Sequence, residues 1–513
     1  MVSPSQVYRS TRSSCPEVKS FEEVVIQGLA SDGGLFIPPI IPQVSQETLF
    51  NQWSKLSFQE LAFEIMRLYV SRDEIPDIDL KDLIERSYST FRASEVTPLA
   101  KNVTGDKENF HILELFHGPT YAFKDVALQF LGNLFEYFLQ KTNKDLPQEQ
   151  RKKITVVGAT SGDTGSAAIY GLRGKKDISV FILYPTGRIS PIQEEQMTTV
   201  PDKNVQTLSV KGTFDNCQDI VKAIFGDKDF NSRHNVGAVN SINWARILAQ
   251  MTYYFYSYFQ ATGGKADKVK FVVPSGNFGD ILAGYFAKKM GLPIEKLVIA
   301  TNENDILDRF LKSGTYERSD KVAVTLSPAM DILISSNFER LLWYLAYENL
   351  ANHDALKAGE ICNTWFQELK TKGSFTVDKA VIEGALKDFS SERVSNAETT
   401  ATIKKIYQAS QRPEKYILDP HTAVGVCATE RLIASDNDSS MHYISLSTAH
   451  PAKFADAVND ALTSYSDYSF EKDVLPEELK KLGKLEKKIR LVEKADTELV
   501  KAVIEEELAK MEL

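Results

Sequence analysis

The sequence begins with amphipathic helical patterns and continues with short apolar runs that alternate with helical ones. Residues 58–70, FQELAFEIMRLYV, repeat apolar positions at three- and four-residue intervals, which predicts a helix. From about residue 96, continuous apolar runs are each followed by a turn and a helical segment. Strands that are apolar throughout and alternate with helices indicate parallel sheets covered on both faces, so we predict an α/β fold with two such sheets. The predicted strands are ITVVGAT at 154–160, ISVFILYP at 178–185, KVKFVVPSG at 268–276, EKLVIATN at 295–302, KYILD at 415–419 and HYISLST at 442–448.

This change of pattern divides the chain into three regions. We predict a mainly helical N-terminal domain over residues 1–95, a central α/β region over 96–460 and a charged helical tail over 461–513. Within the central region, residues 302–411 are more polar and more helical than their surroundings, and we interpret them as an insertion. The Lys and Glu runs of the tail are typical of a solvated helix face, and partner binding is the less favoured interpretation.

Composition and charge exclude several classes of protein. The 513 residues are 43% hydrophobic and 25% charged, as in ordinary globular proteins, which excludes a disordered or fibrous chain. The 60 Lys and Arg residues against 69 Asp and Glu residues leave a formal net charge of −9, without the basic bias of a nucleic-acid binder. The acidic balance disfavours anionic membranes, and no apolar run approaches the roughly 18–20 residues of a bilayer span.

Cysteine and histidine usage gives no sign of a disulfide scaffold or a metal site. The four cysteines form no Cys-x-x-Cys pair, and the seven histidines are scattered. The N-terminus lacks the apolar core of a secretory signal, and Glu17, Glu22 and Glu23 follow its Ser- and Arg-containing start. We therefore predict a cytoplasmic protein.

The segment HGPTYAFKDVALQF, residues 117–130, places a lysine at the start of a predicted helix. Lys124 follows apolar Ala122 and Phe123 and does not lie on a long charged face. A lysine desolvated there has a lowered pKa and becomes a usable nucleophile. The alternative is a lysine whose ammonium group reaches solvent, which for a single lysine is the commoner case.

Three strand-to-helix junctions carry small and hydroxyl residues where a ligand could approach. ATSGDTGSAA at 159–168 and PSGNFGD at 274–280 bring the backbone close to a ligand and leave helix-start amides free for an anion. PSGNFGD has neither the Lys-Ser/Thr ending of a nucleotide loop nor the GxGxxG of a nicotinamide site. STAHPAKF at 447–454 ends a strand with Ser447 and Thr448, whose hydroxyls could cap a helix or contact a ligand ring. One such junction alone is better explained as a tight turn.

Together these motifs are the parts that hold pyridoxal phosphate: a lysine for the Schiff base, a loop for the phosphate and a group for the pyridine nitrogen. At the same motifs the chain strongly resembles the threonine synthase family in its long fungal form. YRSTR at 8–12 and GLASDGGLF at 28–36 also match, and the resemblance covers nearly the whole chain. It implies a fold-type-II pyridoxal-phosphate enzyme similar to the tryptophan synthase β subunit, with two α/β subdomains and a helical N-terminal domain.

The resemblance also implies the roles of particular residues. Lys124 carries the cofactor and moves protons at Cα and Cβ of the substrate, and Thr448 faces the pyridine nitrogen. The phosphate-binding loop of the cofactor is formed by Gly276, Asn277, Phe278, Gly279 and Asp280. The loop that faces the substrate carboxylate and the phenolic oxygen of the cofactor consists of Ser161, Gly162, Asp163 and Thr164.

The implied reaction is that of a lyase that converts O-phospho-L-homoserine and water into L-threonine and phosphate. For the substrate phosphate we select NSINWARILAQ at 240–250, where Ser241, Asn243 and Arg246 open a predicted helix. An arginine suits bidentate contact with phosphate. A helix cap followed by a surface arginine explains this segment equally well.

Two other functions remain open at this point. The first is a related phospho-lyase that yields 2-oxobutyrate, and the second is a catalytically idle relative that binds a metabolite. The intact Lys124 argues against the idle relative. By family analogy we expect a monomer that acts on a small molecule, with no metal, no nucleic acid and no membrane as partner.

Overall fold

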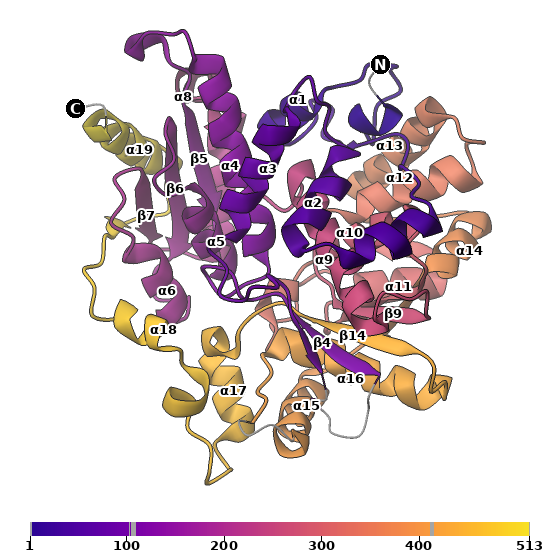
Figure 1. Cartoon of the computed structure of the whole chain (residues 1–513). Coiled ribbons are helices and arrows are strands. Elements are labelled where there is room, and N and C mark those ends of the chain that lie inside the picture. Colours follow the sequence, from indigo (N-terminus) through magenta and orange to yellow (C-terminus); the bar gives the residue numbers. More distant parts are fainter. Residues whose placement is uncertain (1–2, 102, 104–108, 411–414, 512–513) are drawn as a thin grey trace.

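Residues 3–101, 103, 109–410 and 415–511 are described in the computed structural model of the chain (Figure 1). The N-terminal region pairs two short antiparallel strands, β1 (Arg9–Ser10) and β2 (Phe36–Ile37). Its helices are α1 (Phe21–Gln27), α2 (Phe58–Arg67) and α3 (Asp77–Tyr88). Ser57 and Glu60 form a reciprocal capping box at the start of α2, which confirms the helix predicted from residue 58.

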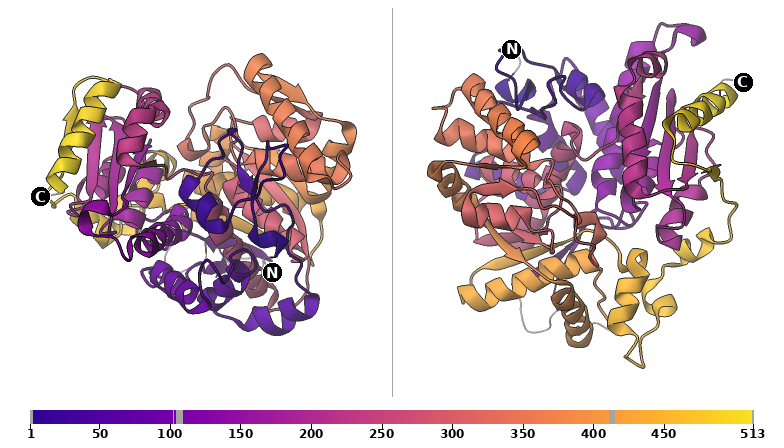
Figure 2. Two further views of the ribbon diagram at one scale, coloured as in Figure 1. Left: turned by 90° about the horizontal axis from the view of Figure 1, so that it is seen from above. Right: turned by 180° about the vertical axis from the view of Figure 1, so that it is seen from behind.

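A five-stranded parallel sheet forms one half of the molecule, in the order β15-β7-β6-β5-β8. Its strands are β5 (Ile154–Ala159), β6 (Ile178–Pro185), β7 (Val205–Val210), β8 (Val236–Gly237) and β15 (Arg490–Val492). Its helices are α5 (Asp163–Leu172), α6 (Pro191–Thr198), α7 (Phe214–Gly226), α8 (Lys228–His234) and α19 (Thr497–Met511). Figures 1 and 2 show that α19, at the C-terminal end of the chain, returns to lie beside this sheet.

A six-stranded sheet forms the other half, in the order β13-β10-β9-β14-β4-β3. All neighbouring strands run parallel except the edge strand β3, which is antiparallel to β4. Two parallel sheets confirm the predicted α/β class. The strands are β3 (Leu99–Lys101), β4 (Phe110–Glu114), β9 (Val269–Pro274), β10 (Ile294–Thr301), β13 (Phe389–Arg393) and β14 (His442–Ser447). Long helices that contact this sheet are α9 (Trp244–Thr262), α10 (Gly279–Lys289) and α16 (Pro420–Asp436), and α4 (Lys124–Asn143) packs on α9 and on α5.

The segment interpreted as an insertion is mainly helical, but it also contributes β13 to the edge of the six-stranded sheet. Its last residue, Gln411, lies outside the described residues. The helices are α11 (Ile306–Ser313), α12 (Phe338–Asn349), α13 (Ala355–Lys372), α14 (Lys379–Asp388) and α15 (Asn396–Ala409), and a small antiparallel pair joins β11 (Thr315–Glu317) to β12 (Ser374–Thr376).

Two predicted elements are wrong. Residues 415–419, KYILD, form no strand. Ile417 and Leu418 are buried in a side-chain cluster, and Asp419 caps α16, so the apolar character of this segment comes from side-chain burial. The tail is not helical throughout, because β15 separates α17 (Ala455–Leu462) and α18 (Glu477–Leu482) from α19. β15 pairs with β7, and its Val492 is buried. The charged residues on either side of β15 gave this part of the tail a helical pattern, so the strand was not predicted.

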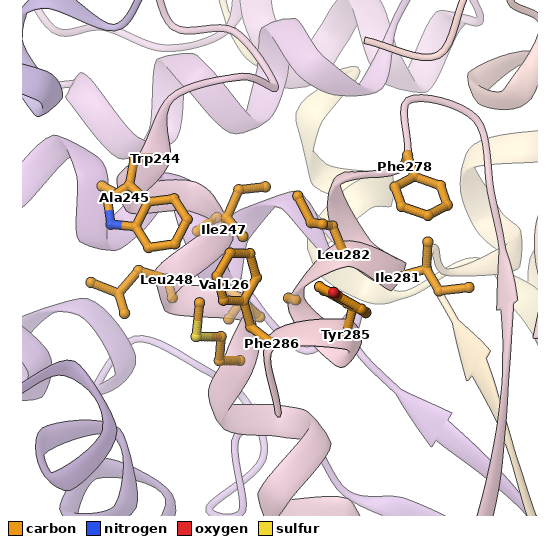
Figure 3. Close-up of a cluster of buried hydrophobic side chains, with 14 of the residues drawn as sticks. Val126, Trp244, Ala245, Ile247, Leu248, Phe278, Ile281, Leu282, Tyr285 and Phe286 are labelled. Atoms are coloured by element: carbon orange, nitrogen blue, oxygen red, sulfur yellow. The ribbon is translucent and has the colours of Figure 1, made fainter. Parts of the chain in front are cut away.

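A hydrophobic cluster fixes the starts of three helices relative to one another. Figure 3 shows Val126 of α4, Trp244 and Leu248 of α9, and Phe286 of α10 lying together in this core. Lys124 and Trp244 are the first residues of α4 and α9, and Gly279 is the first residue of α10. The core therefore holds the helix starts that carry the predicted site residues.

Helices α4 and α5 approach each other backbone to backbone. A Cβ atom added at Gly132 of α4 would lie 1.9 Å from the carbonyl oxygen of Gly171 in α5. A Cβ atom at Gly171 would lie 2.5 Å from the carbonyl oxygen of Leu128. These two glycines permit the contact, and they hold together the helices that begin at Lys124 and Asp163.

Candidate active site

Three of the predicted site segments follow the carboxyl ends of strands, one from the five-stranded sheet and two from the six-stranded sheet. β5 leads into the turn before Asp163, β9 leads into residues 274–280, and β14 ends immediately before Thr448. Ligands of α/β proteins bind outside the carboxyl ends of parallel strands. The two sheets thus direct these three segments to the kind of position where a ligand is expected.

The segment that precedes α4 lies directly against the segment that follows β14. The Phe123 amide donates to the Thr448 carbonyl oxygen at 2.8 Å, and the His450 amide donates to the Tyr121 carbonyl oxygen at 3.0 Å. An isolated antiparallel bridge also joins Ala122 to Ala449. The structure therefore brings the lysine motif and the STAHPAKF motif together.

The Lys124 amine lies in an environment that favours its neutral form. Burial is the main cause that lowers its pKa to about 8, and the positive charges of Lys453 and Arg246 lower it further. The carboxylates of Asp163 and Asp125 act in the opposite direction. Near pH 8 about half of such amines are unprotonated, and a neutral amine can act as a nucleophile and accept a proton.

Asp163 begins α5 and is held by two side chains from other elements. Its Oδ1 atom accepts a hydrogen bond from Gln193 Nε2 at 2.9 Å and forms an ion pair with Lys453 Nζ at 2.8 Å. Burial alone would raise the pKa of Asp163, but the Lys453 and Lys124 ammonium groups outweigh it and hold the pKa well below its usual range. Asp163 is therefore a fixed negative charge near Lys124.

The turn before α5 has little room for side chains. Gly162 has a φ of 150°, and a Cβ atom there would lie 2.5 Å from Gln193 Oε1. Ser161 is exposed, Thr164 is half-buried, and the amides of Gly162 and Gly165 both donate to Thr160 Oγ1. This turn presents an exposed hydroxyl beside the buried Asp163.

The loop of residues 274–280 exposes several backbone amides. Ser335 Oγ donates to the Gly276 carbonyl oxygen at 2.6 Å, and the Asn337 amide donates to the Asn277 carbonyl oxygen at 3.0 Å. Phe278 adopts a φ of 64° immediately before α10. Within the described ranges, the amides of residues 276–279 have no hydrogen-bond acceptor. Carbonyls turned to protein donors and successive free amides suit an anion such as phosphate.

Asp280 does not direct its side chain toward such an anion. Its Oδ1 atom accepts hydrogen bonds from the hydroxyls of Tyr253 at 2.6 Å and Tyr254 at 2.8 Å, both on α9. Burial raises its pKa to about 6. Asp280 can thus contribute its backbone amide to the loop, while its carboxyl group ties α10 to α9.

Thr448 has its hydroxyl available. The residue is 7% exposed, and its hydroxyl has no hydrogen-bond partner in the part of the chain that the structure describes. The neighbouring Ser447 hydroxyl is different, because it lies 2.9 Å from Thr422 Oγ1. Of these two hydroxyls, Thr448 is the one that a ligand can use.

The segment of residues 240–250 combines a structural cap with a buried cation. Both side-chain amide atoms of Asn243 have protein partners, the Ala245 amide and the Val25 carbonyl oxygen, so Asn243 caps α9. Arg246 is not the surface arginine of the alternative interpretation, since it is 3% exposed and burial lowers its pKa to about 10. Its Nε and Nη1 atoms have no hydrogen-bond partner among the described residues. A buried cation without a counter-ion indicates a place for an anion.

Ser241 lies just before this cap and is half-buried. Its carbonyl oxygen accepts a hydrogen bond from Asn337 Nδ2 at 3.1 Å, and its hydroxyl lies 3.5 Å from Ser336 Oγ. Asn337 also donates to the Asn277 carbonyl oxygen. Asn337 therefore connects the 240–250 segment to the 274–280 loop.

Sequence reasoning missed three residues of the site. Lys453 Nζ donates to the Thr120 carbonyl oxygen at 2.9 Å, and Gln193 holds Asp163. Asp125 accepts from the Thr120 amide at 2.8 Å and from the Thr120 hydroxyl at 2.7 Å, and burial raises its pKa to about 6. The only signal for Lys453 is its place among apolar residues in HPAKF, as for Lys124 in YAFKD.

Other kinds of site find no support in the described residues. No group of three or more His, Cys, Asp or Glu side chains is arranged there to hold a metal ion, and the four cysteines are free thiols. Among the same residues, no helix has both the length and the apolar character needed to cross a bilayer.

The residues present fit pyridoxal phosphate: a buried amine of lowered pKa, a run of amides for a phosphate group and a hydroxyl for a ring nitrogen, where the amides and the hydroxyl have no partner among the described residues. The fold and the site define a pyridoxal-phosphate-dependent enzyme, and the family described as "Pyridoxal-phosphate dependent enzyme" matches residues 92–439. The families "Threonine synthase N terminus" and "Threonine synthase, C-terminal" match residues 7–88 and 422–504. The chain belongs to the threonine synthase family.

Known relatives agree over the full length of the chain. Threonine synthase of Saccharomyces cerevisiae is 82% identical over 514 residues, covering 100% of each chain. The crystal structure of threonine synthase from yeast has a TM-score of 0.97 and covers 99% of this chain and 100% of its own. The structure of PLP-bound threonine synthase from Brucella melitensis is 40% identical, with a TM-score of 0.86, and covers 98% of this chain and 99% of its own.

These findings confirm the predicted family, fold class, cofactor and enzyme class. The chain is a pyridoxal-phosphate-dependent lyase of the threonine synthase type that acts on a small-molecule substrate. The phospho-lyase that yields 2-oxobutyrate is not favoured.

Proposed function

We propose that this chain converts O-phospho-L-homoserine and water into L-threonine and phosphate, with Lys124 as the catalytic residue. The observation that carries the proposal is the buried Lys124 amine, whose pKa of about 8 lies close to neutrality. A proton carrier works best when its pKa lies near the working pH. The Thr448 segment is hydrogen-bonded to the segment that precedes Lys124, and the amides of residues 276–279 have no acceptor among the described residues; both observations support a cofactor site that includes Lys124.

In the proposed arrangement, the chain holds the cofactor at three points. Lys124 would attach to it, the amides of Gly276, Asn277, Phe278 and Gly279 and the backbone of Asp280 would bind its phosphate, and the Thr448 hydroxyl would meet its ring nitrogen. Bound there, pyridoxal phosphate supplies the electron sink that stabilises a carbanion at the substrate Cα.

The substrate phosphate has its own proposed site. Arg246 is a buried cation whose Nε and Nη1 atoms have no hydrogen-bond partner in the described part of the chain, and the Ser241 hydroxyl precedes it on the same segment. A guanidinium group can donate two parallel hydrogen bonds to a phosphate and balance its charge as it leaves Cγ. Asn243, which is part of the same prediction, supports the site by capping α9.

The remaining roles follow from charge and position. Lys124 can take a proton from Cα and give one at Cβ, because near pH 8 both of its protonation states are populated. Ser161, Gly162 and Thr164 are the proposed contacts of the substrate carboxylate, and the exposed Ser161 hydroxyl supports that assignment. Asp163 is a fixed anion, so it repels a carboxylate and is the better partner for a cation or a hydroxyl.

A product assay tests the proposal. The protein loaded with pyridoxal phosphate is given O-phospho-L-homoserine, L-homoserine or L-serine. We expect equal amounts of threonine and phosphate from O-phospho-L-homoserine alone. L-Homoserine lacks the phosphate group that Arg246 would bind, and L-serine has no leaving group at Cγ. Mainly 2-oxobutyrate, or no turnover with any of the three, would overturn the proposal.

Location, assembly and domain division are also part of the proposal. Four free thiols support a reducing compartment such as the cytoplasm. Family analogy supports a monomer, which the mass measured by light scattering during size-exclusion chromatography would test. We propose the divisions near residues 95 and 460 as domain boundaries, and limited proteolysis would test them.

A further inference from the structure

We propose that Lys453 is a positioning residue that fixes Asp163 as the carboxylate facing Lys124 and thereby keeps the Lys124 amine reactive. The inference rests on the proposed role of Lys124 and assigns a new residue to the same site. Lys453 lies at the STAHPAKF junction, in the short helix of residues 451–454, and its side chain has no exposed surface.

Two hydrogen-bonding contacts of Lys453 reach the two segments that matter for Lys124. Its Nζ atom lies 2.8 Å from Asp163 Oδ1 at the start of α5 and donates at 2.9 Å to the carbonyl oxygen of Thr120. Thr120 is four residues before Lys124, and it also binds Asp125 through its amide and its hydroxyl. One buried ammonium group therefore ties the turn before α5 to the loop that leads into Lys124.

Gln193 and Gln196 of α6 complete the same arrangement. Gln193 Nε2 donates to Asp163 Oδ1 at 2.9 Å, and Gln196 Nε2 donates to the Thr120 carbonyl oxygen at 3.0 Å. Both oxygen atoms that Lys453 binds thus have a second, neutral donor. The two glutamine amides are neutral, so Lys453 is the donor that brings a positive charge to both oxygen atoms.

The charges explain why a cation is needed there. Among the described residues, the charged groups that act most strongly on Lys124 are Asp163, Asp125, Lys453 and Arg246. When those four are ionised, their charges cancel, and the buried cluster is neutral only while Lys124 is neutral. A buried net charge is costly, so this balance favours the uncharged amine that attacks a carbonyl carbon. His450, which also lies near Lys453, adds no charge at neutral pH, because burial lowers its pKa to about 3.

Removal of the Lys453 ammonium group should change the pKa of the Lys124 nitrogen in a predictable direction. In Lys453→Met, Asp163 keeps the hydrogen bond from Gln193 but loses its cationic partner, so its negative charge favours the cationic form of the Lys124 nitrogen and the pKa of that nitrogen rises. In Asp163→Asn, the anion is lost and the pKa falls. In the double variant, both effects disappear together, and the cluster again has no net charge from this pair.

The test follows the absorption band of the full-length protein loaded with pyridoxal phosphate as a function of pH. The band reports the protonation of the Lys124 nitrogen bound to the cofactor. We expect Lys453→Met to raise the pH midpoint by at least about one unit, which is a tenfold shift in the protonation equilibrium. Asp163→Asn should lower the midpoint, the double variant should return within about half a unit of the parent, and Lys453→Arg, which keeps the charge, should do the same.

Lys270→Met is the matched control. Lys270 also forms a largely buried ion pair, at 2.6 Å with Asp436, but it lies on β9 toward the end opposite the 274–280 loop. Its loss should lower the thermal midpoint and leave the pH midpoint unchanged. If Lys453→Met does not fold, the midpoints of Asp163→Asn, the double variant and Lys453→Arg carry the test.

Two outcomes separate this inference from the proposed function. If the parent shows a lysine-bound cofactor band and makes threonine, but every variant keeps the parental pH midpoint, Lys453 has only a structural role and the inference is wrong. If the parent shows no such band, the proposed function itself fails.

Discussion

Gly132→Ala tests whether the contact between α4 and α5 holds the site together. The new Cβ atom would lie 1.9 Å from the oxygen and 2.7 Å from the carbon of the Gly171 carbonyl. A relaxed contact between carbon and a carbonyl oxygen is about 3.3 Å, so the helices would have to separate by about 1.4 Å. Both opposing atoms belong to the backbone of a helix, so neither can rotate away.

The expected cost follows from that displacement. Inserting a methyl group into a packed core costs about 1–3 kcal/mol, occasionally more, when side chains can adjust. Because backbone cannot adjust in that way, we expect Gly132→Ala to lose at least about 3 kcal/mol of unfolding free energy. Since α4 begins at Lys124 and α5 at Asp163, the same separation should also slow threonine formation.

Denaturant unfolding and turnover of the cofactor-loaded variant measure both effects. Gly226→Ala is the matched control: Gly226 ends α7, and a Cβ atom there would have no neighbour within 4 Å. We expect that control to change stability by less than about 1 kcal/mol. Parental stability and parental turnover in Gly132→Ala would refute the reasoning about this contact.

The other predictions concern the site itself. Lys124→Ala should keep the fold, measured by circular dichroism, and lose both the lysine-bound cofactor band and threonine formation; a variant with normal turnover would remove Lys124 from its role. Cofactor capture by the cofactor-free protein should accelerate as the pH rises through about 8 and then level off, because the neutral amine of Lys124 reacts; a rise that continues above pH 10 would indicate an ordinary lysine. Thr448→Ala should weaken cofactor binding by about 0.5–1.5 kcal/mol, or roughly two- to tenfold, in an equilibrium titration, and unchanged affinity would exclude the hydroxyl contact. Arg246→Leu should raise KM for O-phospho-L-homoserine without weakening the protein, since it removes a buried cation whose Nε and Nη1 atoms have no hydrogen-bond partner within the described ranges; an unchanged KM would exclude Arg246 from the substrate phosphate.

Much of the fold could be predicted, because the strands and helices concerned have their apolar pattern within one continuous segment. The strand predicted at residues 178–185 is β6, and the helix predicted to start after Phe123 begins at Lys124. The strand predicted at residues 415–419 does not form, because Ile417 and Leu418 are buried in a side-chain cluster and not in a sheet. β15 was missed because only its pairing with β7, far away in the sequence, makes it a strand.

The site was predictable only where one segment carried its own signal. Lys124, Thr448 and the glycine-rich loops stand in recognisable strings. Lys453 binds Thr120 from 333 positions away, and no pattern around either residue shows that contact. The same limit applies to Arg246, whose burial comes from the packing of α9 and could not be distinguished from a surface position by its spacing.

We propose that Lys124 is the residue that carries and uses the cofactor. Reduction of the loaded protein with sodium borohydride fixes pyridoxal phosphate to the amine that holds it, and peptide mass spectrometry then locates the modified residue. We predict a single modified peptide containing Lys124, formed in proportion to the activity lost. Modification at another lysine, with Lys124 unmodified and activity abolished, would contradict the account.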